Sequence, residues 1–256
     1  MSGKDDKIDI VARAKELQRR KLPKRVYKTA GVGPASGGGF EVLLDSRAIR
    51  TPGRAKVEVP SQELARRLAA EWQAQGEDID PATMPLTRLV NTTVESAGRD
   101  DAALRAEIHR YAGSDLLLYR ATEPDDLVAR QREVWDKALA DFARRFDVHF
   151  EPVAGITHHP QPEAALVRIE QIIAALGRFT LMATASATSL AGSAVLALGA
   201  AHGVFDRDFA WEAAHVDEDF NINRWGADDE AAARRRFRRA DFDAAMDVIA
   251  LVGLER

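Results

Sequence analysis

The chain has 256 residues and a mass of 28.1 kDa, a length that suits one large domain or two modest ones. With 46% hydrophobic and 30% charged residues, its composition is that of a globular protein, which excludes a wholly disordered chain. The formal net charge of −4 gives no global basic excess, so we predict no nucleic-acid partner. The absence of cysteine excludes disulfides, thiolate nucleophiles and cysteine-based zinc sites, and it fits a reducing cytosol.

The N-terminal part of the chain divides into a tail and a β-rich domain. Residues 1–23 are polar and mixed in charge, without the apolar stretch of a secretory signal, and predict a basic tail that is flexible or helical. Residues 24–60 predict a small β-rich domain. Its expected strands cover residues 25–29, 40–44, 48–51 and 56–59. The glycine-rich stretch Gly31–Gly39 lacks the spacing of a phosphate-binding loop, so we interpret it as a hairpin loop and predict no nucleotide cofactor.

From residue 61 onward the signals are almost entirely helical, and we assign residues 61–256 to a helical C-terminal domain. Ser61 is the predicted N-cap of the first helix, on which Leu64, Leu68 and Trp72 recur at four-residue spacing. Trp72 is therefore predicted to be a structural core residue. The expected helices cover residues 61–75, 84–96, 101–112, 125–146, 163–176, 208–224 and 229–252, with an edge strand over 148–153. Strands followed by helices favour an α+β fold.

One segment, Phe179–Phe205, carries no formal charge and is long enough to span a bilayer. It is rich in threonine and serine, contains Gly192, and has no flanking aromatic belt or one-sided basic cluster. We therefore predict a buried helix pair or a kinked central helix rather than a membrane span.

Other motifs in the chain do not match the patterns of known metal, catalytic or nucleic-acid sites. Alternating oxygen-bearing residues in Asp217–Asn223 resemble the start of a calcium loop, but Ile222 takes the place of its central glycine. The adjacent His158 and His159 lack metal-ligand spacing, and no nucleophile motif is present, so we predict no metal site and no catalytic residue. The arginines of residues 234–239 wrap too far around a helix to form one basic stripe.

Helical phase distinguishes two faces on the last two predicted helices. Phe209, Ala213, Val216 and Phe220 form one stripe that we expect to be buried, and Phe237, Ala240, Ala244, Val248 and Leu251 form another. Glu218 and Trp225 lie almost opposite the first stripe, which suggests a contact surface. Gly226 fits the residue after a helix C-cap and Asp228 an N-cap, so the local acids have an equally good interpretation as helix caps.

Several motifs in a fixed order resemble one protein family over residues 25–235. The parts of the resemblance are Val42–Pro52, Val59-Pro60, Glu71-Trp72 with Gln75, Met84–Thr87, Tyr111, Asp115–Arg120, Gln131, Trp135-Asp136, Pro160-Gln161, Val216–Asn221, Trp225-Gly226 and Glu230. The sequence is similar to the assembly chaperones that capture the free α-subunit of F-type ATP synthase, called assembly factor 2 in mitochondria. Asp217 and Asn221 replace the usual Glu and Gln, which leaves open whether Asp217 or Glu218 carries the family's acidic role.

The resemblance implies a non-enzymatic chaperone that binds the α-subunit, shields its interface until β-subunits replace it, and uses no cofactor. It implies a bacterial cytoplasmic protein, or a matrix protein if the chain is a processed one. Together with the helical phase it makes five residues the candidate partner-binding set: Asp217, Glu218, Phe220, Trp225 and Glu230. Trp72 and Gly226 are the candidate structural residues. The oligomeric state stays open.

Two other classes of function remain as alternatives. One is a small-molecule hydrolase that uses the carboxylates near residues 217–230, together with His158 and His159. The other is a membrane-bound scaffold held by residues 179–205.

Overall fold

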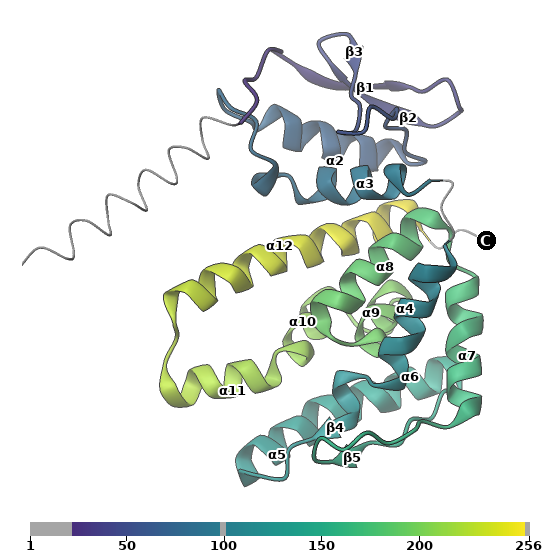
Figure 1. Cartoon of the computed structure of the whole chain (residues 1–256), viewed down its shortest axis with the longest axis vertical. Coiled ribbons are helices and arrows are strands. Elements are labelled where there is room, and N and C mark those ends of the chain that lie inside the picture. The colour runs from purple at the N-terminus through teal and green to yellow at the C-terminus, as the bar shows by residue number, and fades with distance from the viewer. Residues whose placement is uncertain (1–21, 98–100, 254–256) are drawn as a thin grey trace, which may run out of the picture. The chain divides into compact units, whose positions relative to one another are not determined.

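A computed structural model describes residues 22–97 and 101–253 of the chain (Figure 1). The chain divides into two compact units, Met1–Arg88 and Leu89–Arg256, which are described separately below. The N-terminal unit therefore includes the first long helix, which the sequence analysis placed in the helical domain. Most of the predicted tail, residues 1–21, lies outside the described residues. The predicted domain boundaries after residues 23 and 60 stay a prediction.

The N-terminal unit contains a small antiparallel sheet of order β1-β2-β3. Its strands are β1 (Ala30–Pro34), β2 (Phe40–Leu44) and β3 (Arg47–Ala48). The buried Val42 of β2 stands opposite Val32 of β1, which fixes the register of the hairpin. The bounds of β2 match the prediction. The predicted strand over residues 56–59 is reduced to isolated bridges at Lys56 and Val59.

The first strand lies later in the chain than the alternation predicted. Residues 25–29 form no strand, because side chains bind this segment to the end of the first long helix: the Arg25 guanidinium donates to the Gln73 carbonyl at 3.0 Å, and the Tyr27 hydroxyl to the Trp72 carbonyl at 2.7 Å. Residues 31–34, about half of the expected hairpin loop, belong to strand β1 instead. The actual turn closes with a 2.9 Å bond from the Ala35 N–H to the Gly39 carbonyl. A Cβ on Gly39 would stand 2.6 Å from the Val59 carbonyl oxygen, so close approach of two backbones requires glycine there.

Helix α2 (Gln62–Gln73) packs against the sheet and contributes the core residues Leu64 and Leu68. The Ser61 hydroxyl accepts from the Leu64 N–H at 3.3 Å, which confirms the predicted N-cap. Trp72 is only partly buried: its ring stands 6.0 Å from that of Tyr27, and its carbonyl accepts the Tyr27 hydroxyl at 2.7 Å. Its structural role therefore rests on these contacts and stays a prediction.

The chain leaves α2 through the short helix η1 (Pro81–Thr83) and enters α3 (Pro85–Glu95), the helix that crosses from one unit into the next. The Glu71 carboxylate caps the start of α3 by accepting from the N–H groups of Leu86 and Thr87, both at 2.8 Å. Burial raises the pKa of Glu71 above its usual value, and these bonds to the charged form oppose that rise.

The C-terminal unit is helical apart from one short pair of parallel strands. Its first part comprises α4 (Ala102–Gly113), η2 (Leu116–Leu118), β4 (Tyr119–Arg120), α5 (Asp125–Gln131), η3 (Arg132–Asp136), α6 (Lys137–Phe146) and β5 (Val153–Ala154). Its second part comprises α7 (Glu163–Ala174), α8 (Arg178–Ala191), α9 (Ala194–Ala201), α10 (Arg207–Ala214), α11 (Val216–Trp225) and α12 (Asp229–Val252). The predicted edge strand over residues 148–153 is wrong, since only Val153 and Ala154 pair, with β4. Together the two units confirm the predicted α+β fold.

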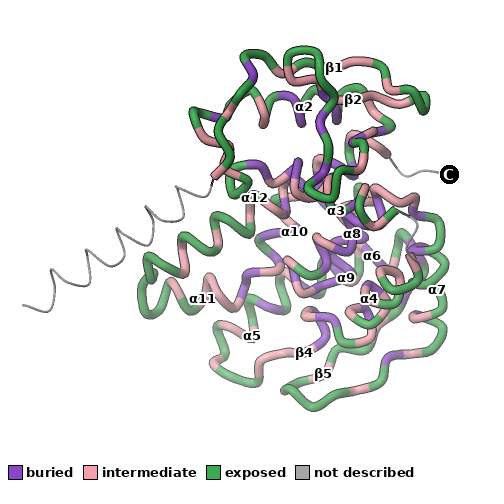
Figure 2. The backbone as a smooth tube through the Cα atoms, turned by 45° about the horizontal axis from the view of Figure 1, so that its top comes forward, coloured by how far each residue is buried: buried purple, intermediate pink, exposed green. Residues whose placement is uncertain are grey.

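The uncharged segment forms the helix pair α8 and α9 at the core of this unit (Figure 2). Nine residues of α8 are buried, among them Thr180, Thr184 and Thr188, and α12, α4 and α9 pack around it. Gly192 ends α8 with a φ of 67°, and the Ser193 hydroxyl caps α9. No helix in the described ranges is both long enough and apolar enough to cross a membrane.

The predicted helix over residues 208–224 is two helices that meet at His215. The buried His215 side chain explains the break: its Nδ1 lies 2.7 Å from the Trp211 carbonyl, and its ring stacks 4.0 Å from the Trp211 ring. On α12 the predicted stripe is partly wrong. Phe237 is 46% exposed, and the buried face begins at Phe242.

A buried carboxylate joins the two halves of the C-terminal unit. Asp115 is fully buried, and its two oxygens accept from the N–H groups of Leu117, at 3.1 Å, and Val195, at 3.0 Å. It therefore ties the start of η2 to the start of α9. Burial raises its pKa to about 6, from a model-peptide value of 3.8.

We expect Asp115→Asn to lower the Tm, since its single amide oxygen can accept only one of the two N–H groups and the other loses its acceptor, at a cost of about 1–3 kcal/mol. Because the pKa of Asp115 is higher in the folded chain, the carboxyl contributes stability that is fully present below about pH 4 and lost by about pH 6. Calorimetric melts should therefore show a larger Tm deficit of the variant at about pH 4.5 than at pH 7. Asp125→Asn, at an exposed position of α5, is the control. A deficit that grows with pH would contradict this assignment.

Candidate functional site

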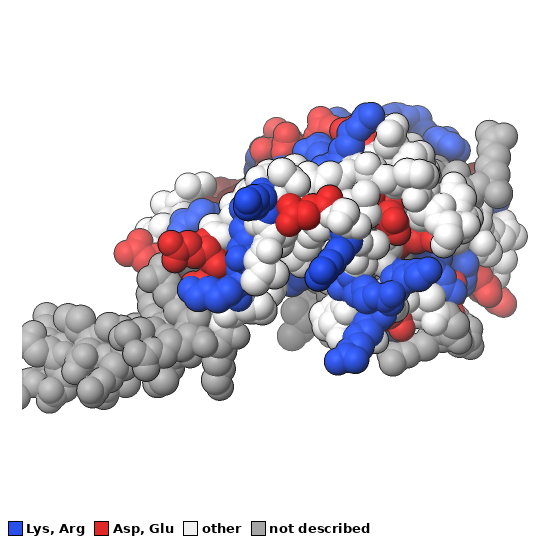
Figure 3. Space-filling view, turned by 90° about the horizontal axis from the view of Figure 1, so that it is seen from above, with Lys and Arg blue, Asp and Glu red and all other residues white. Residues whose placement is uncertain are grey.

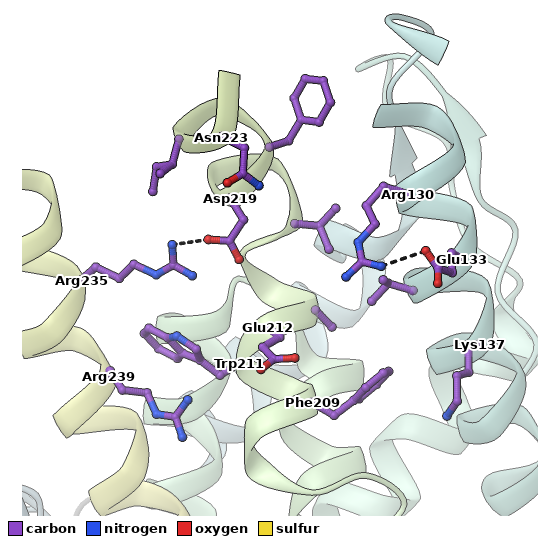
Figure 4. Close-up of a pocket in the computed structure, with 15 residues that line it drawn as sticks. Arg130, Glu133, Lys137, Phe209, Trp211, Glu212, Asp219, Asn223, Arg235 and Arg239 are labelled. Atoms are coloured by element: carbon purple, nitrogen blue, oxygen red, sulfur yellow. Dashed lines mark hydrogen bonds and ion pairs between the residues drawn. The ribbon is translucent and has the colours of Figure 1, made fainter. Parts of the chain in front are cut away.

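The C-terminal unit contains an open groove of about 790 Å³ (Figure 4). Helices α10 and α11 form its floor, the continuous helix α5–η3–α6 one wall, and α12 the other. In Figure 1, α11 and the first part of α12 are joined at one end and extend away from the other helices of this unit.

The apolar stripe that we expected to be buried lies in this groove. Phe209, Ala213, Val216 and Phe220 all line it. Ala213 and Val216 are buried beneath it, but the two phenylalanines are partly exposed. The prediction of a wholly buried stripe is therefore wrong. The periodicity of the sequence correctly placed these residues on one helix face. It could not show whether other helices cover that face.

Charges line the groove in pairs. On one wall the Arg130 guanidinium bonds Glu133 at 2.8 Å. On the other, Arg235 pairs with Asp219 of the floor, and Arg239 bonds Asp243 at 2.9 Å. These pairs leave the walls close to electrical balance, so the groove presents apolar surface between polar rims.

The structure places Asp217 against the wall of the groove rather than on an open surface. Its carboxylate accepts from the Gln131 Nε2 at 2.7 Å, and Gln131 is only 2% exposed. The Gln131 Oε1 in turn accepts from the Ala121 N–H at 2.8 Å. Sequence reasoning missed Gln131 as a site residue, although it is one of the residues that carry the family resemblance.

Glu218 lies on the other side of α11. Its carboxylate stands 3.8 Å from the Nε2 of the buried His215 and 4.0 Å from the Arg235 guanidinium. Burial lowers the pKa of His215, so this ring is neutral near pH 7 and the pair is not an ion pair there. Glu218 therefore contacts the helix junction and α12, whereas Asp217 contacts α5.

The remaining candidate residues lie at the end of the α11–α12 hairpin. Trp225 is 73% exposed, as its helical phase predicted, and Gly226 adopts a φ of 90° that favours glycine. The Asp228 carboxylate accepts from the Ala231 N–H at 2.8 Å, which confirms the N-cap of α12. Glu230 is exposed and pairs with Arg234 at 2.5 Å. Of the five predicted partner-binding residues, only Phe220 lines the groove.

The residues of the alternative enzyme reading are not brought together. His158 lies 3.1 Å from the Tyr119 hydroxyl, whereas His159 lies 3.2 Å from the Glu151 carboxylate. Across residues 22–97 and 101–253, no group of three histidine or acidic side chains is close enough to hold a metal ion. The carboxylates of α11 are likewise separated, since Gln131 holds Asp217 and Arg235 holds Asp219.

A π-helical stretch, η3, positions the wall of the groove against its floor. Trp135 of η3 is fully buried and donates its indole N–H to the Ala213 carbonyl of α10 at 2.8 Å. Arg120 covers its ring at 5.3 Å and bonds the neighbouring Asp136 at 2.7 Å. The residues of the resemblance in this region thus hold one helix of the groove to the next.

Comparison with known proteins confirms the family resemblance of the sequence. The profile of the family described as ATP12 chaperone protein matches residues 24–143. The structure of Atp12 from Paracoccus denitrificans is 35% identical with a TM-score of 0.83, and the match covers 91% of this chain and 100% of that one. The chain belongs to the ATP12 chaperone family.

Two further solved structures match along nearly the whole chain. A protein of Agrobacterium tumefaciens, for which a chaperone role has been suggested, is 38% identical with a TM-score of 0.87, over 95% of this chain and 91% of that one. An aspartate-to-lysine mutant of the P. denitrificans Atp12p is 34% identical with a TM-score of 0.83, over 92% of this chain and 100% of that one. Both units of the present chain therefore have the architecture of ATP12 family members.

The contacts of Asp217 and Glu230 predict different effects of the same charge change on the Tm. We expect Asp217→Lys to lower the Tm by several degrees, because it leaves the buried Gln131 amide without its acceptor, at about 1–3 kcal/mol. Glu230→Lys should stay within about 0.5 kcal/mol of the wild type, since its partner Arg234 is also exposed. Circular-dichroism melts of both variants measure the difference, and equal melting temperatures would contradict the role given to Gln131.

Proposed function

We propose that this chain assists assembly of the catalytic head of F-type ATP synthase by binding the free α-subunit until β-subunits replace it. Membership of the ATP12 chaperone family supports a chaperone role. The observation that carries the finer proposal is the open groove, whose partly exposed apolar floor at Phe209 and Phe220, rimmed by polar residues, is the kind of surface that binds protein partners.

The exposed surface of the free α-subunit explains why a binder with an apolar groove is needed. An α-subunit made ahead of its β partners exposes apolar surface that ends in a permanent interface. A binder that covers part of this surface lowers the concentration of the aggregation-prone species by mass action. Release needs no ATP hydrolysis if the β-subunit binds the same surface more tightly. In a bacterium this exchange takes place in the cytoplasm, and in a mitochondrion in the matrix.

The walls of the groove favour a helical segment of the client. All three sides are helices whose backbone groups bond within each helix, so the groove offers no strand edge for an extended peptide. An extended segment would therefore leave its own N–H and C=O groups unpaired against Phe209 and Phe220. In an amphipathic helix the backbone N–H and C=O groups are already hydrogen-bonded within the helix. Such a helix can place apolar side chains on the floor and polar ones beside Arg130 and Arg235.

The acidic residues of α11 have a supporting role in this proposal. Asp217 fixes the floor of the groove against α5, and Glu218 fixes it against α12. Trp225, exposed at the end of the hairpin, extends the apolar surface beyond the groove. A change at either acid is then expected to alter binding through the shape of the groove.

Placing a charge on the floor tests the proposal directly. We expect Phe220→Glu to fold with a near-normal Tm, since Phe220 is partly exposed, but to lose at least tenfold in suppressing aggregation of purified α-subunit. Val167→Glu, at a 45% exposed position of α7 outside the groove, is the matched control and should protect normally. Light scattering of α-subunit against chaperone concentration measures the effect. Normal protection by a folded Phe220→Glu would overturn the groove as the binding site.

A further inference from the structure

A second surface with its own chemistry lies in the N-terminal unit. Four basic residues within ten positions, Arg47, Arg50, Arg54 and Lys56, are all exposed. In the part of the chain that the structure describes, none of the four forms an ion pair with a carboxylate, whereas Lys24 and Arg66 of the same unit do. We call these four residues the basic arch.

The backbone holds the basic arch in one conformation. The Thr51 N–H donates to the Ala55 carbonyl at 3.0 Å, and the buried Thr51 hydroxyl accepts from the Ala55 N–H at 3.1 Å. Arg54 adopts a φ of 68°, which a residue with a side chain rarely does. The Arg50 guanidinium donates to the Arg54 carbonyl at 3.0 Å and so closes the turn. The backbone that carries these cations is therefore ordered before any ligand arrives.

Two of these cations face each other across an antiparallel bridge that pairs Arg50 with Lys56. Side chains directly opposite in such a bridge lie close together, and like charges in this arrangement are destabilising. Two nearby acids form hydrogen bonds elsewhere. Asp45 accepts from the N–H groups of Lys28 and Thr29, both at 3.0 Å, and Glu58 accepts from the Gly39 N–H at 3.1 Å.

A hollow of about 570 Å³ opens beside this pair. Arg50 and Lys56 line it together with one carboxylate, that of Glu41, so cations outnumber anions at its rim. The hydroxyl-bearing Ser36 and Ser46 also line it. Apolar side chains complete the lining: Pro34, Ala35, Leu43, Ala48 and Ile49. The hollow thus combines positive charge, hydrogen-bond donors and apolar surface.

We propose that this hollow is a second docking site, and that it binds an acidic segment of a protein partner in which carboxylates alternate with apolar side chains. The carboxylates would pair with Arg50 and Lys56, relieving their mutual repulsion, and the apolar side chains would cover the lining near Leu43. This site is independent of the groove in the C-terminal unit, because no residue lines both.

A protein segment fits this surface better than a nucleic acid. The hollow is lined by no aromatic side chain on which a base could stack, and the chain carries a net charge of −4. On the face shown in Figure 3, acidic side chains stand among the basic ones, so no uniformly basic track crosses it.

The test must distinguish the docking site from another explanation of the basic arch. Charged residues at the edge of a sheet prevent edge-to-edge association, and Arg47 belongs to the edge strand β3. That explanation predicts that neutralising Arg50 and Lys56 makes the chain self-associate, with no effect on acidic ligands.

The test measures binding of a fluorescein-labelled decapeptide of alternating glutamate and leucine by fluorescence anisotropy. We expect R50E/K56E to weaken its Kd at least tenfold, and R50Q/K56Q to weaken it by a smaller factor. Circular-dichroism melts check that both variants are folded, since each loses the bond from Arg50 to the Arg54 carbonyl. R66E/R236E, which makes the same charge change at exposed positions outside the arch, should bind as the wild type does. Raising the salt concentration should weaken binding to the wild type but not to R50E/K56E.

Four outcomes would overturn the proposal. They are equal loss of binding in the control variant, self-association of R50Q/K56Q in gel filtration with unchanged peptide affinity, tighter binding of a thymidine 20-mer than of the peptide, and tighter binding of anionic phosphatidylserine vesicles than of the peptide. Because Phe220→Glu leaves the hollow intact, it should bind the acidic decapeptide normally. The two proposed sites can therefore fail separately.

Discussion

The fold of the C-terminal unit depends on burying one helix on nearly all sides. Helix α8 is surrounded by α4, α9 and α12, and such close contact is possible only because its buried positions carry small residues such as Ala183, Ala187 and Thr188. This requirement explains why the segment lacks charge, a property that taken alone also fits a membrane span. Helix length distinguishes the two, since Gly192 divides the segment into helices of 14 and 8 residues, each too short to cross a bilayer.

Covering α8 determines where the groove forms. The buried face of α12 begins at Phe242, so the C-terminal half of this helix covers the core, while the half from Asp229 to Asp241 reaches beyond it. Helix α11 runs back along that projecting half and is held to it by the pair of Asp219 and Arg235. The opposite wall is fixed by Gln131 and Trp135. A groove with an apolar floor therefore follows from a helix that is longer than the core it covers.

Local signals in the sequence predicted local structure well. The caps Ser61 and Asp228 are each a side chain that satisfies a nearby N–H group, so short-range chemistry determines them. The break at His215 was missed because it depends on the Trp211 carbonyl and ring, which periodicity does not describe. The glycine-rich stretch does form a hairpin, but its loop is shorter than predicted, because Gly31–Pro34 pair with β2, a partner that glycine content does not reveal.

The candidate site was predictable in position but not in geometry. Helical phase correctly placed Trp225 on the surface, yet it could not show that Phe209 and Phe220 line an open groove, because burial depends on helices elsewhere in the chain. The motif residues Gln131, Trp135 and Asp217 position the helices of the groove, whereas Asp217 was expected to contact a partner. They bond to one another's helices rather than to solvent, and so hold the floor and walls apart at a fixed distance. A groove built this way loses little conformational freedom when a partner enters, and in the function proposed here this preorganisation favours binding of a client to a modest apolar surface.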